Sequence, residues 1–262
     1  MQQAAFNACG LPLRYERWPT PAAELRERVA SLRASDILGA NVTIPHKERV
    51  IPYLDELGDA SARVGAVNTI VNRNGRLFGF NTDGPGFVMA LRREAQRDPA
   101  GAAVLLVGAG GAARGIGFAL LDAQVGRLGV WNRTRERAER LAADFARSGD
   151  RMRVVVEDDL SAVAGYDIVV NCTAVGMTGT GTEEDVPFDP AGTSAGALIV
   201  DIVYTPLETA LLARARACGR AVLGGLPMLV YQGALAFELW TGLPAPLETM
   251  FEAARAAIVA RT

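Results

Sequence analysis

Hydrophobic spacing in the first part of the chain switches between helical and extended patterns. In "TPAAELRERVASLRAS", Leu25, Val29 and Leu32 recur on one helical face, and Thr20 is the expected N-terminal cap. "DILGANVT" predicts a strand that runs into a loop. "PHKERVIPYLDEL" returns to helical spacing, and Pro52 predicts a kink or a break in that helix.

A β-hairpin and a further helix are expected next. The strand-like runs of "AVNTIVNRNGRLFGFNTD" flank Asn74 and Gly75. An Asn-Gly pair favours the positive φ angles of a two-residue hairpin turn. "GPGFVMALRREAQRD" then has helical spacing up to Pro99, where the pattern changes.

Short apolar runs alternate with helical segments in the second part of the chain. The predicted strands lie in "AAVLLV", "RLGVWNRT", "RVVVEDDL", "YDIVVN", "ALIVDIVY" and "RAVLGG". Helices such as "RERAERLAADFARSG" and "TPLETALLARARACG" separate them, and this alternation predicts a parallel sheet with crossover connections. The last two helices are expected in "MLVYQGALAFELWTG" and "PLETMFEAARAAIVA".

These patterns predict an α/β fold with two domains. A Rossmann-type, doubly wound parallel sheet is expected over residues 99–225. An α/β substrate domain is expected over residues 1–98 and is completed by the C-terminal helices of residues 226–262. The length of 262 residues agrees with one or two domains.

Composition narrows the class of protein further. A net charge of −2, with both signs interspersed, gives no reason to expect binding to nucleic acid or to an acidic membrane. Three cysteines far apart fit neither a disulfide framework nor a zinc site, and a single histidine argues against a metal centre. No apolar run reaches membrane-spanning length. The sequence therefore predicts a cytoplasmic protein without a metal site.

A glycine-rich turn is the first candidate for chemistry. In "VLLVGAGGAARG", the G-x-G-x-x-A pattern stands between an apolar strand and a helix, which is the context that such a turn requires. Glycines let the backbone approach a pyrophosphate, and the helix N-terminus offers free N–H groups. The residues of the turn that we expect to bind a dinucleotide are Gly108, Ala109, Gly110, Gly111 and Ala112.

The end of the next strand indicates which dinucleotide. An NAD site would have an acidic residue there, whereas this chain has Asn132, Arg133 and Thr134, with Arg137 one helical turn later. A carboxylate would repel a 2′-phosphate, but a guanidinium group binds it through charge-assisted hydrogen bonds. The sequence therefore favours NADP. Arg135 is expected to belong to a solvated helix face instead.

Three polar stretches precede this region: "NVTIPHK", "AVNT" and "GFNTDGPG". Their amides and hydroxyls suit a polyhydroxylated small molecule. Lys47 and Asp83 can form a proton-transfer pair, because opposite charges stabilise each other's ionised forms while burial opposes them. Taken singly, Asn and Asp residues near glycines are more often turn residues.

Taken together, these strings, with "GAGGAARG", "NRT", "DIVYTPLET" and "GLPMLVYQGALAFELW", resemble the shikimate dehydrogenase family in one order along nearly the whole chain. The resemblance implies an NADP-dependent oxidoreductase of aromatic amino-acid and chorismate biosynthesis that interconverts 3-dehydroshikimate and shikimate. It implies that Lys47 and Asp83 are the catalytic pair. It also implies a small-molecule substrate, no nucleic-acid or membrane partner, and a monomer or homodimer.

The same resemblance assigns the other site residues. The implied substrate contacts are Asn41, Thr43, Asn68, Tyr204 and Gln232, with Tyr204 near the substrate carboxylate. The implied cofactor contacts beyond the glycine turn are Asn132, Arg133, Thr134, Arg137, Asn171, Thr173, Gly225 and Met228. His46 lies beside Lys47, but the family does not require a histidine there, so we expect no catalytic role for it.

The start of the chain departs from the family pattern. The family normally begins with a strand and a Ser-x-Ser-Pro stretch whose serines hold the substrate carboxylate. This chain begins "MQQAAFNACGLPLRYERW", which resembles the helix after that stretch. Either Met1 is an internal methionine of a longer protein, or the chain is a shortened relative. In the second case Tyr204 alone would anchor the carboxylate, and we expect a raised KM.

Three other functions remain open on the sequence. A quinate or quinate/shikimate dehydrogenase has the same chemistry, but such enzymes are often NAD-linked, and Arg133 argues against NAD. A non-catalytic NADP-binding relative would explain the missing serines, but such a protein has no need of Lys47 and Asp83. A methylene-tetrahydrofolate dehydrogenase shares the two-domain plan and fits "NTDGPG" and "NRT" less well.

Overall fold

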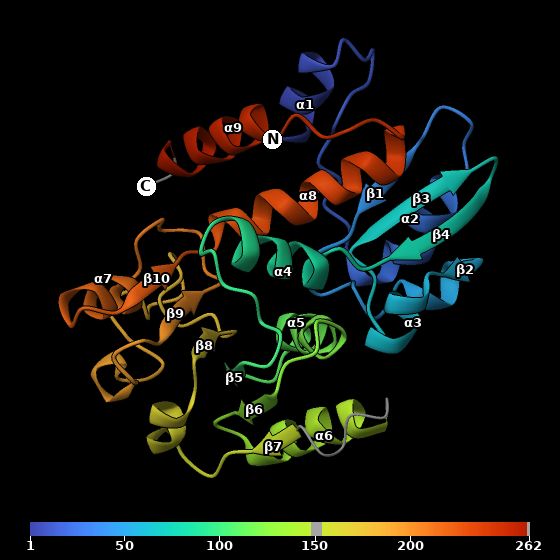
Figure 1. Cartoon of the computed structure of the whole chain (residues 1–262). Helices are drawn as coiled ribbons and strands as arrows, with labels where there is room; N and C mark the ends of the chain where they lie inside the picture. Colours follow the sequence, from blue (N-terminus) through green and yellow to red (C-terminus); the bar gives the residue numbers. More distant parts are fainter. Residues whose placement is uncertain (148–153, 261–262) are drawn as a thin grey trace.

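Two β-sheets, joined by long helices, organise the chain (Figure 1). The computed structural model describes residues 1–147 and 154–260. The larger sheet has six parallel strands in the order β10-β9-β8-β5-β6-β7. These strands are β5 (Ala103–Val107), β6 (Arg127–Trp131), β7 (Val154–Val156), β8 (Ile168–Asn171), β9 (Leu198–Asp201) and β10 (Ala221–Leu223).

Both faces of this sheet are buried, as expected for a doubly wound fold. Successive residues of β5 point to opposite faces: Val104 and Leu106 belong to one apolar cluster, and Leu105 and Val107 belong to another. The elements that cover the sheet are α5 (Gly111–Asp122), α6 (Arg135–Phe145), α7 (Ala210–Ala217) and the 3-10 helices η4 (Leu160–Gly165) and η5 (Pro190–Gly192). The predicted Rossmann-type sheet is therefore confirmed.

Residues 148–153 lie outside the described part of the chain. They include the end of the helix predicted in "RERAERLAADFARSG" and the first residue of the strand predicted in "RVVVEDDL". The rest of each prediction corresponds to α6 and β7.

The smaller sheet has four strands in the order β1-β3-β4-β2. They are β1 (Gly39–Asn41), β2 (Glu56–Leu57), β3 (Thr69–Arg73) and β4 (Arg76–Phe80). The predicted hairpin joins β3 to β4, and Asn74 and Gly75 have φ angles of 54° and 83°. Helices α2 (Leu25–Ser31) and α3 (Asp59–Val64) lie beside this sheet, and η1 (Ala22–Glu24) directly precedes α2.

Two local predictions near this sheet are wrong. The segment "PHKERVIPYLDEL" forms turns and the 3-10 helix η2 (Ile51–Tyr53) instead of an α-helix. The break expected at Pro52 does occur, because proline has no N–H and its ring would clash with the carbonyl four residues earlier in an α-helix. Thr20 does not cap a helix, because its hydroxyl donates to the carbonyl of Trp18 at 2.9 Å and Pro21 stands at the cap position.

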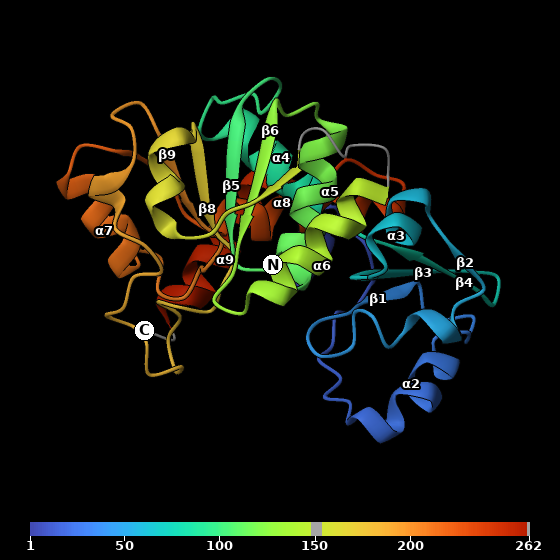
Figure 2. The same ribbon diagram turned by 90° about the horizontal axis from the view of Figure 1, so that it is seen from below.

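Helices α4 (Asp83–Arg93) and α8 (Leu226–Thr241) lie between the two sheets, with α1 (Gln2–Ala8) and α9 (Leu247–Val259) beside α8 (Figures 1 and 2). Helices α4 and α8 approach closely at Gly86, where a Cβ atom would lie 2.6 Å from the backbone nitrogen of Gln232. A larger residue at position 86 would push the two helices apart. Within the described residues, no helix is both long enough and apolar enough to span a membrane.

Candidate active site

A cleft of about 700 Å³ lies where the carboxyl ends of the parallel strands face β1 and the start of α4. In open α/β sheets, ligands bind at this end of the strands. The cleft gathers residues from stretches that are far apart along the chain. The predicted site residues that line it are Asn41, Thr43, Lys47, Asn68, Asp83, Gly110, Gly111, Ala112, Thr173, Tyr204, Gly225, Met228 and Gln232.

Lys47 and Asp83 meet in this cleft. The Nζ atom of Lys47 donates to Oδ2 of Asp83 at 2.7 Å, and the two side chains are 24% and 11% exposed. Asp83 is the first residue of α4, so its carboxylate also lies at the positive end of the helix dipole. The backbone N–H of Asp83 donates to the side chain of Asn81 at 3.1 Å, which fixes the start of the helix. The carboxylate is thus held in place while one face of the ammonium group remains open to the cleft.

Asn68 joins this pair to α8. Its Nδ2 atom lies 2.9 Å from Oδ1 of Asp83, 2.9 Å from the hydroxyl of Thr82 and 3.3 Å from Oε1 of Gln232. Its Oδ1 atom accepts from the backbone N–H of Thr82 at 2.8 Å. Asn68 itself is 2% exposed. A buried amide with partners on both sides defines the relative positions of Asp83 and Gln232.

Asn41, at the end of β1, forms the next part of the wall. Its Nδ2 atom donates to the carbonyl of Asn68 and to the hydroxyl of Thr69, both at 3.3 Å. Its Oδ1 atom accepts from the hydroxyl of Tyr15 at 2.9 Å. Tyr204, which is 40% exposed, lines the cleft from the loop after β9. The polar groups around the Lys47–Asp83 pair therefore come from both sheets.

The glycine turn has the geometry that a pyrophosphate site requires. Gly108 has a φ angle of 113°, and a Cβ atom there would lie 2.9 Å from Thr173. Nothing lies within 4 Å of a Cβ atom built on Gly110 or Gly111, so the first turn of α5 borders open space. Free N–H groups at a helix N-terminus bind anionic groups. The turn therefore fits a dinucleotide.

The arginines after β6 differ in their partners. Arg135 forms ion pairs with Glu139 at 2.8 Å and with Asp158. Arg133 and Arg137 are exposed, and neither pairs with a carboxylate within residues 1–147 and 154–260. Both therefore remain available for an anionic ligand.

The side chain of Asn132 links this strand end to the glycine turn. Its Oδ1 atom accepts from the N–H of Ala109 at 3.2 Å, and its Nδ2 atom donates to the carbonyl of Thr134 at 2.8 Å. Some of the predicted cofactor residues in and beside the turn do not line the 700 Å³ cleft. They are Gly108, Ala109, Asn132, Arg133, Thr134 and Arg137. Their predicted contacts with a cofactor stay predictions.

The predicted position of Asn171 needs correction. We expected it to line the cofactor cleft, but it is fully buried below the cleft. Its amide donates to Asp201 at 2.9 Å, and its Oδ1 atom accepts from the N–H of Thr173 at 3.0 Å. Asp201 is fully buried, and burial raises the pKa of its carboxyl group despite hydrogen bonds from Thr209, Val203 and Asn171. Asn171 therefore supports Thr173 from beneath.

His46 and Cys172 hold ordinary structural positions. The Nε2 atom of His46 donates to the carbonyl of Thr20 at 2.8 Å, and His46 does not line the cleft. Burial raises the pKa of the Cys172 thiol, and the nearby charge of Asp201 adds to this effect. Over the two described ranges, no group of three or more His, Cys, Asp or Glu side chains is placed to hold a metal ion.

The cleft also contains residues that the sequence analysis missed. Gln3, Tyr15 and Arg17 line it from the N-terminal region, and Met177 lines it from the loop after β8. No spacing rule pointed to Tyr15 or Arg17, because both stand in an irregular segment that only the fold brings to the cleft.

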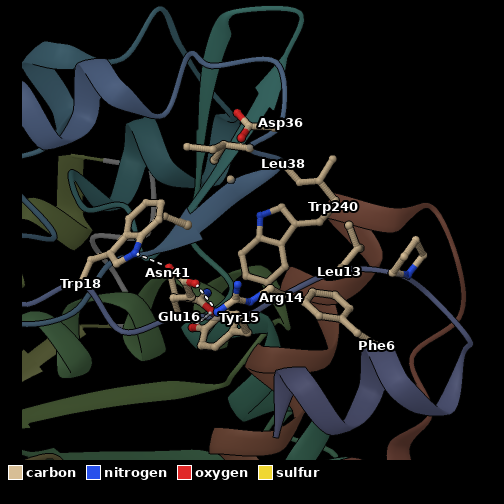
Figure 3. A pocket seen from close by; sticks show the side chains of 14 residues that line it. Phe6, Leu13, Arg14, Tyr15, Glu16, Trp18, Asp36, Leu38, Asn41 and Trp240 are labelled. Carbon is tan, nitrogen blue, oxygen red and sulfur yellow. Dashed lines mark hydrogen bonds and ion pairs between the residues drawn. The ribbon is translucent and has the colours of Figure 1, made fainter.

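A second hollow, of about 420 Å³, lies along the outer edge of β1 (Figure 3). Within the described residues, β1 pairs with β3 alone. Leu13, Leu38 and Trp240 are among the residues around this hollow. Whether Met1 is an internal methionine of a longer protein or the chain is a shortened relative stays a prediction.

Three family models match the chain. Residues 1–70 match the shikimate dehydrogenase substrate-binding domain, and residues 90–205 match the shikimate/quinate 5-dehydrogenase model. Residues 225–255 match the shikimate 5′-dehydrogenase C-terminal domain.

Individual relatives are similar over almost the whole chain. The shikimate dehydrogenase (NADP(+)) of Symbiobacterium thermophilum is 46% identical over 98% of this chain and 89% of its own length. The enzyme of the same name from Moorella thermoacetica is 46% identical over 98% of this chain and 88% of its own length. The structure of shikimate 5-dehydrogenase from Thermus thermophilus, solved with NADP(H) and shikimate, is 41% identical with a TM-score of 0.85. That comparison covers 97% of this chain and 92% of the Thermus chain.

Proposed function

This chain belongs to the shikimate dehydrogenase family, and we propose that it catalyses the NADP-dependent, reversible reduction of 3-dehydroshikimate to shikimate. The observation that carries the proposal is the Lys47–Asp83 pair, 2.7 Å apart, in a cleft that also borders the glycine turn. A ketone reduction needs a proton donor for oxygen beside a hydride donor for carbon. The chain supplies the first, and a nicotinamide would supply the second.

The Lys47 ammonium is the proton-handling group of this proposal. In the direction of reduction, its Nζ–H donates a proton to the substrate oxygen as the C=O bond becomes C–OH. In the direction of oxidation, the neutral amine accepts that proton from the hydroxyl. Asp83 keeps the ammonium oriented and stabilises its positive charge through the 2.7 Å contact.

The amide groups of the cleft orient the substrate. Asn41, Asn68 and Gln232 present donors and acceptors that suit ring hydroxyls, and Thr43 adds a hydroxyl group. Their contacts with one another limit the side-chain entropy that would be lost on binding. Tyr204 is proposed to lie near the substrate carboxylate.

NADPH, when bound, would supply a hydride for the reduction, and NADP⁺ would accept one in the reverse direction. Its pyrophosphate would be held by the backbone of Gly108, Ala109, Gly110, Gly111 and Ala112, and its nicotinamide end by Thr173, Gly225 and Met228. Arg133 and Arg137, with Asn132 and Thr134, would hold the 2′-phosphate. In support, neither arginine pairs with a carboxylate among the described residues.

We also propose that the chain is divided into two domains. Residues 1–98 and 226–262 would form the substrate-binding and catalytic domain, and residues 99–225 the NADP-binding domain. Closure of one domain on the other would exclude water from the cleft. We also propose a cytoplasmic location, a monomeric or homodimeric state and no nucleic-acid partner.

The direct test is NADPH formation, followed by absorbance, with this chain, NADP⁺ and shikimate. Parallel reactions contain quinate in place of shikimate and NAD⁺ in place of NADP⁺. Turnover that needs both shikimate and NADP⁺ would support the proposal, and faster turnover of quinate would redirect it to a quinate dehydrogenase. Binding of NADP⁺ without turnover of either substrate would favour a non-catalytic NADP-binding relative.

A further inference from the structure

The segment between α1 and α2 borders both the active-site cleft and the hollow beside β1. Tyr15 and Arg17 line the active-site cleft. Arg14, Glu16 and Trp18 line the hollow beside β1, where Figure 3 shows them together. Leu13 and Tyr15 also line this hollow, whereas Arg17 lines only the cleft.

The charged side chains of this segment that line the hollow neutralise each other. Arg14 forms an ion pair with Glu16 at 3.0 Å, and Nε1 of Trp18 donates to the same carboxylate at 3.2 Å. Arg17 forms no ion pair within the part of the chain that the structure describes. Burial raises the pKa of the neighbouring Tyr15 hydroxyl, and the positive charge of Arg17 opposes that shift.

The charges within the cleft make Arg17 distinctive. Lys47 also lines the cleft, but Asp83 neutralises it at 2.7 Å. Of the cationic side chains placed along the cleft by the described residues, Arg17 alone is left without a carboxylate partner. An unpaired guanidinium in a concave site favours an anionic ligand, and its planar fork matches a carboxylate.

We propose that Arg17 binds the carboxylate of the substrate and so selects acidic over neutral hydroxyketones. The inference rests on the proposed function, since shikimate is a monocarboxylate. Two residues before Arg17, the hydroxyl of Tyr15 donates to Asn41 at 2.9 Å, which places this part of the segment beside the substrate-binding amides. Tyr204 lines the same cleft.

The test compares Arg17→Gln with Arg14→Gln, a matched control beside the hollow whose side chain is 85% exposed. Each protein is assayed with NADP⁺ and either shikimate or its methyl ester, which has no negative charge. We expect Arg17→Gln to raise KM for shikimate about 10- to 100-fold, as for loss of a charge-assisted hydrogen bond. KM for the methyl ester and for NADP⁺ should stay unchanged, and Arg14→Gln should resemble the wild type.

Calorimetric titration of shikimate into each protein separates the two proposals. If the wild type binds shikimate and Arg17→Gln loses that affinity, the role of Arg17 stands even if no NADP⁺ is reduced, and only the proposed function fails. An Arg17→Gln variant with wild-type shikimate affinity and KM would overturn the role of Arg17. An equal loss of activity toward the methyl ester would overturn it as well, because the effect would then not concern the carboxylate.

Discussion

Replacement of Lys47 by methionine separates proton transfer from the structural use of the same residue. Methionine keeps most of the apolar stem and removes the ammonium group. Asp83 would lose its contact at 2.7 Å but keep Asn68 at 2.9 Å and its place at the start of α4. Because these contacts remain, we expect the free energy of unfolding to fall by only about 1–2 kcal/mol.

The effect on catalysis should be much larger. A positioned general acid or base contributes roughly 10²- to 10⁴-fold to rate, which corresponds to about 3–5 kcal/mol of activation free energy. We therefore expect kcat of Lys47→Met to fall by about that factor, with KM for shikimate changed by less than about tenfold. Initial rates of NADPH formation give both constants, and urea titration gives the free energy of unfolding.

A matched control breaks a comparable ion pair outside the cleft. Arg63 contacts Asp122 at 2.8 Å, but the two side chains are 40% and 52% exposed. Arg63→Met should cost about 0–1 kcal/mol of stability and leave kcat unchanged. If Lys47→Met kept kcat within about threefold of the wild type, Lys47 would not be the proton-handling group. A loss confined to KM would instead make it a binding residue.

Two further predictions concern the cofactor-binding residues. Arg133→Ala should lower the affinity for NADP⁺ about 10- to 100-fold in a fluorescence titration and leave the affinity for NAD⁺ unchanged. Replacement of the ion-paired Arg135 by alanine should change neither affinity. Equal losses for both cofactors in Arg133→Ala would exclude a 2′-phosphate contact. Gly108→Ala should lower the free energy of unfolding by about 1–3 kcal/mol, because its φ angle is 113° and the new Cβ atom would lie 2.9 Å from Thr173. Gly110→Ala, with a φ angle of −92° and open space around it, should fold as stably as the wild type in the same denaturation experiment, and an equal loss would contradict this reasoning.

Several features could be predicted from the sequence because short stretches of backbone determine them. Asn74 and Gly75 adopt positive φ angles readily, so they indicated the hairpin before any contact was known. The strands of the parallel sheet were recognisable because both faces are buried, which leaves nearly continuous apolar runs. The glycine turn was recognisable because Gly108 must adopt a φ angle that other residues rarely adopt.

Predictions failed where a local pattern was considered without its surroundings. The helical spacing of "PHKERVIPYLDEL" described which side chains are apolar and Pro52 was expected to break the helix, but no α-helix forms in this stretch at all. The family resemblance implied that Asn171 lies in the cleft, yet the buried carboxylate of Asp201 holds its amide in the interior. For Asn171, a competing side-chain partner decided the outcome.

The sequence by itself determined the fold class, the cofactor-binding turn and the residue types available for chemistry, since each depends on local backbone preference or on composition. Tertiary structure decided which of those residues meet. Lys47 and Asp83 are 36 positions apart, and Asn68 and Gln232 are 164 positions apart. Gln232 reaches Asn68 because α4 packs tightly against α8 at Gly86, and the stretch of Lys47 is held nearby by the N–H of Val67, which donates to the carbonyl of Lys47 at 2.8 Å. Arg17 faces the cleft for a similar reason: only the packing of its segment between the cleft and the hollow beside β1 determines which side chains face the substrate.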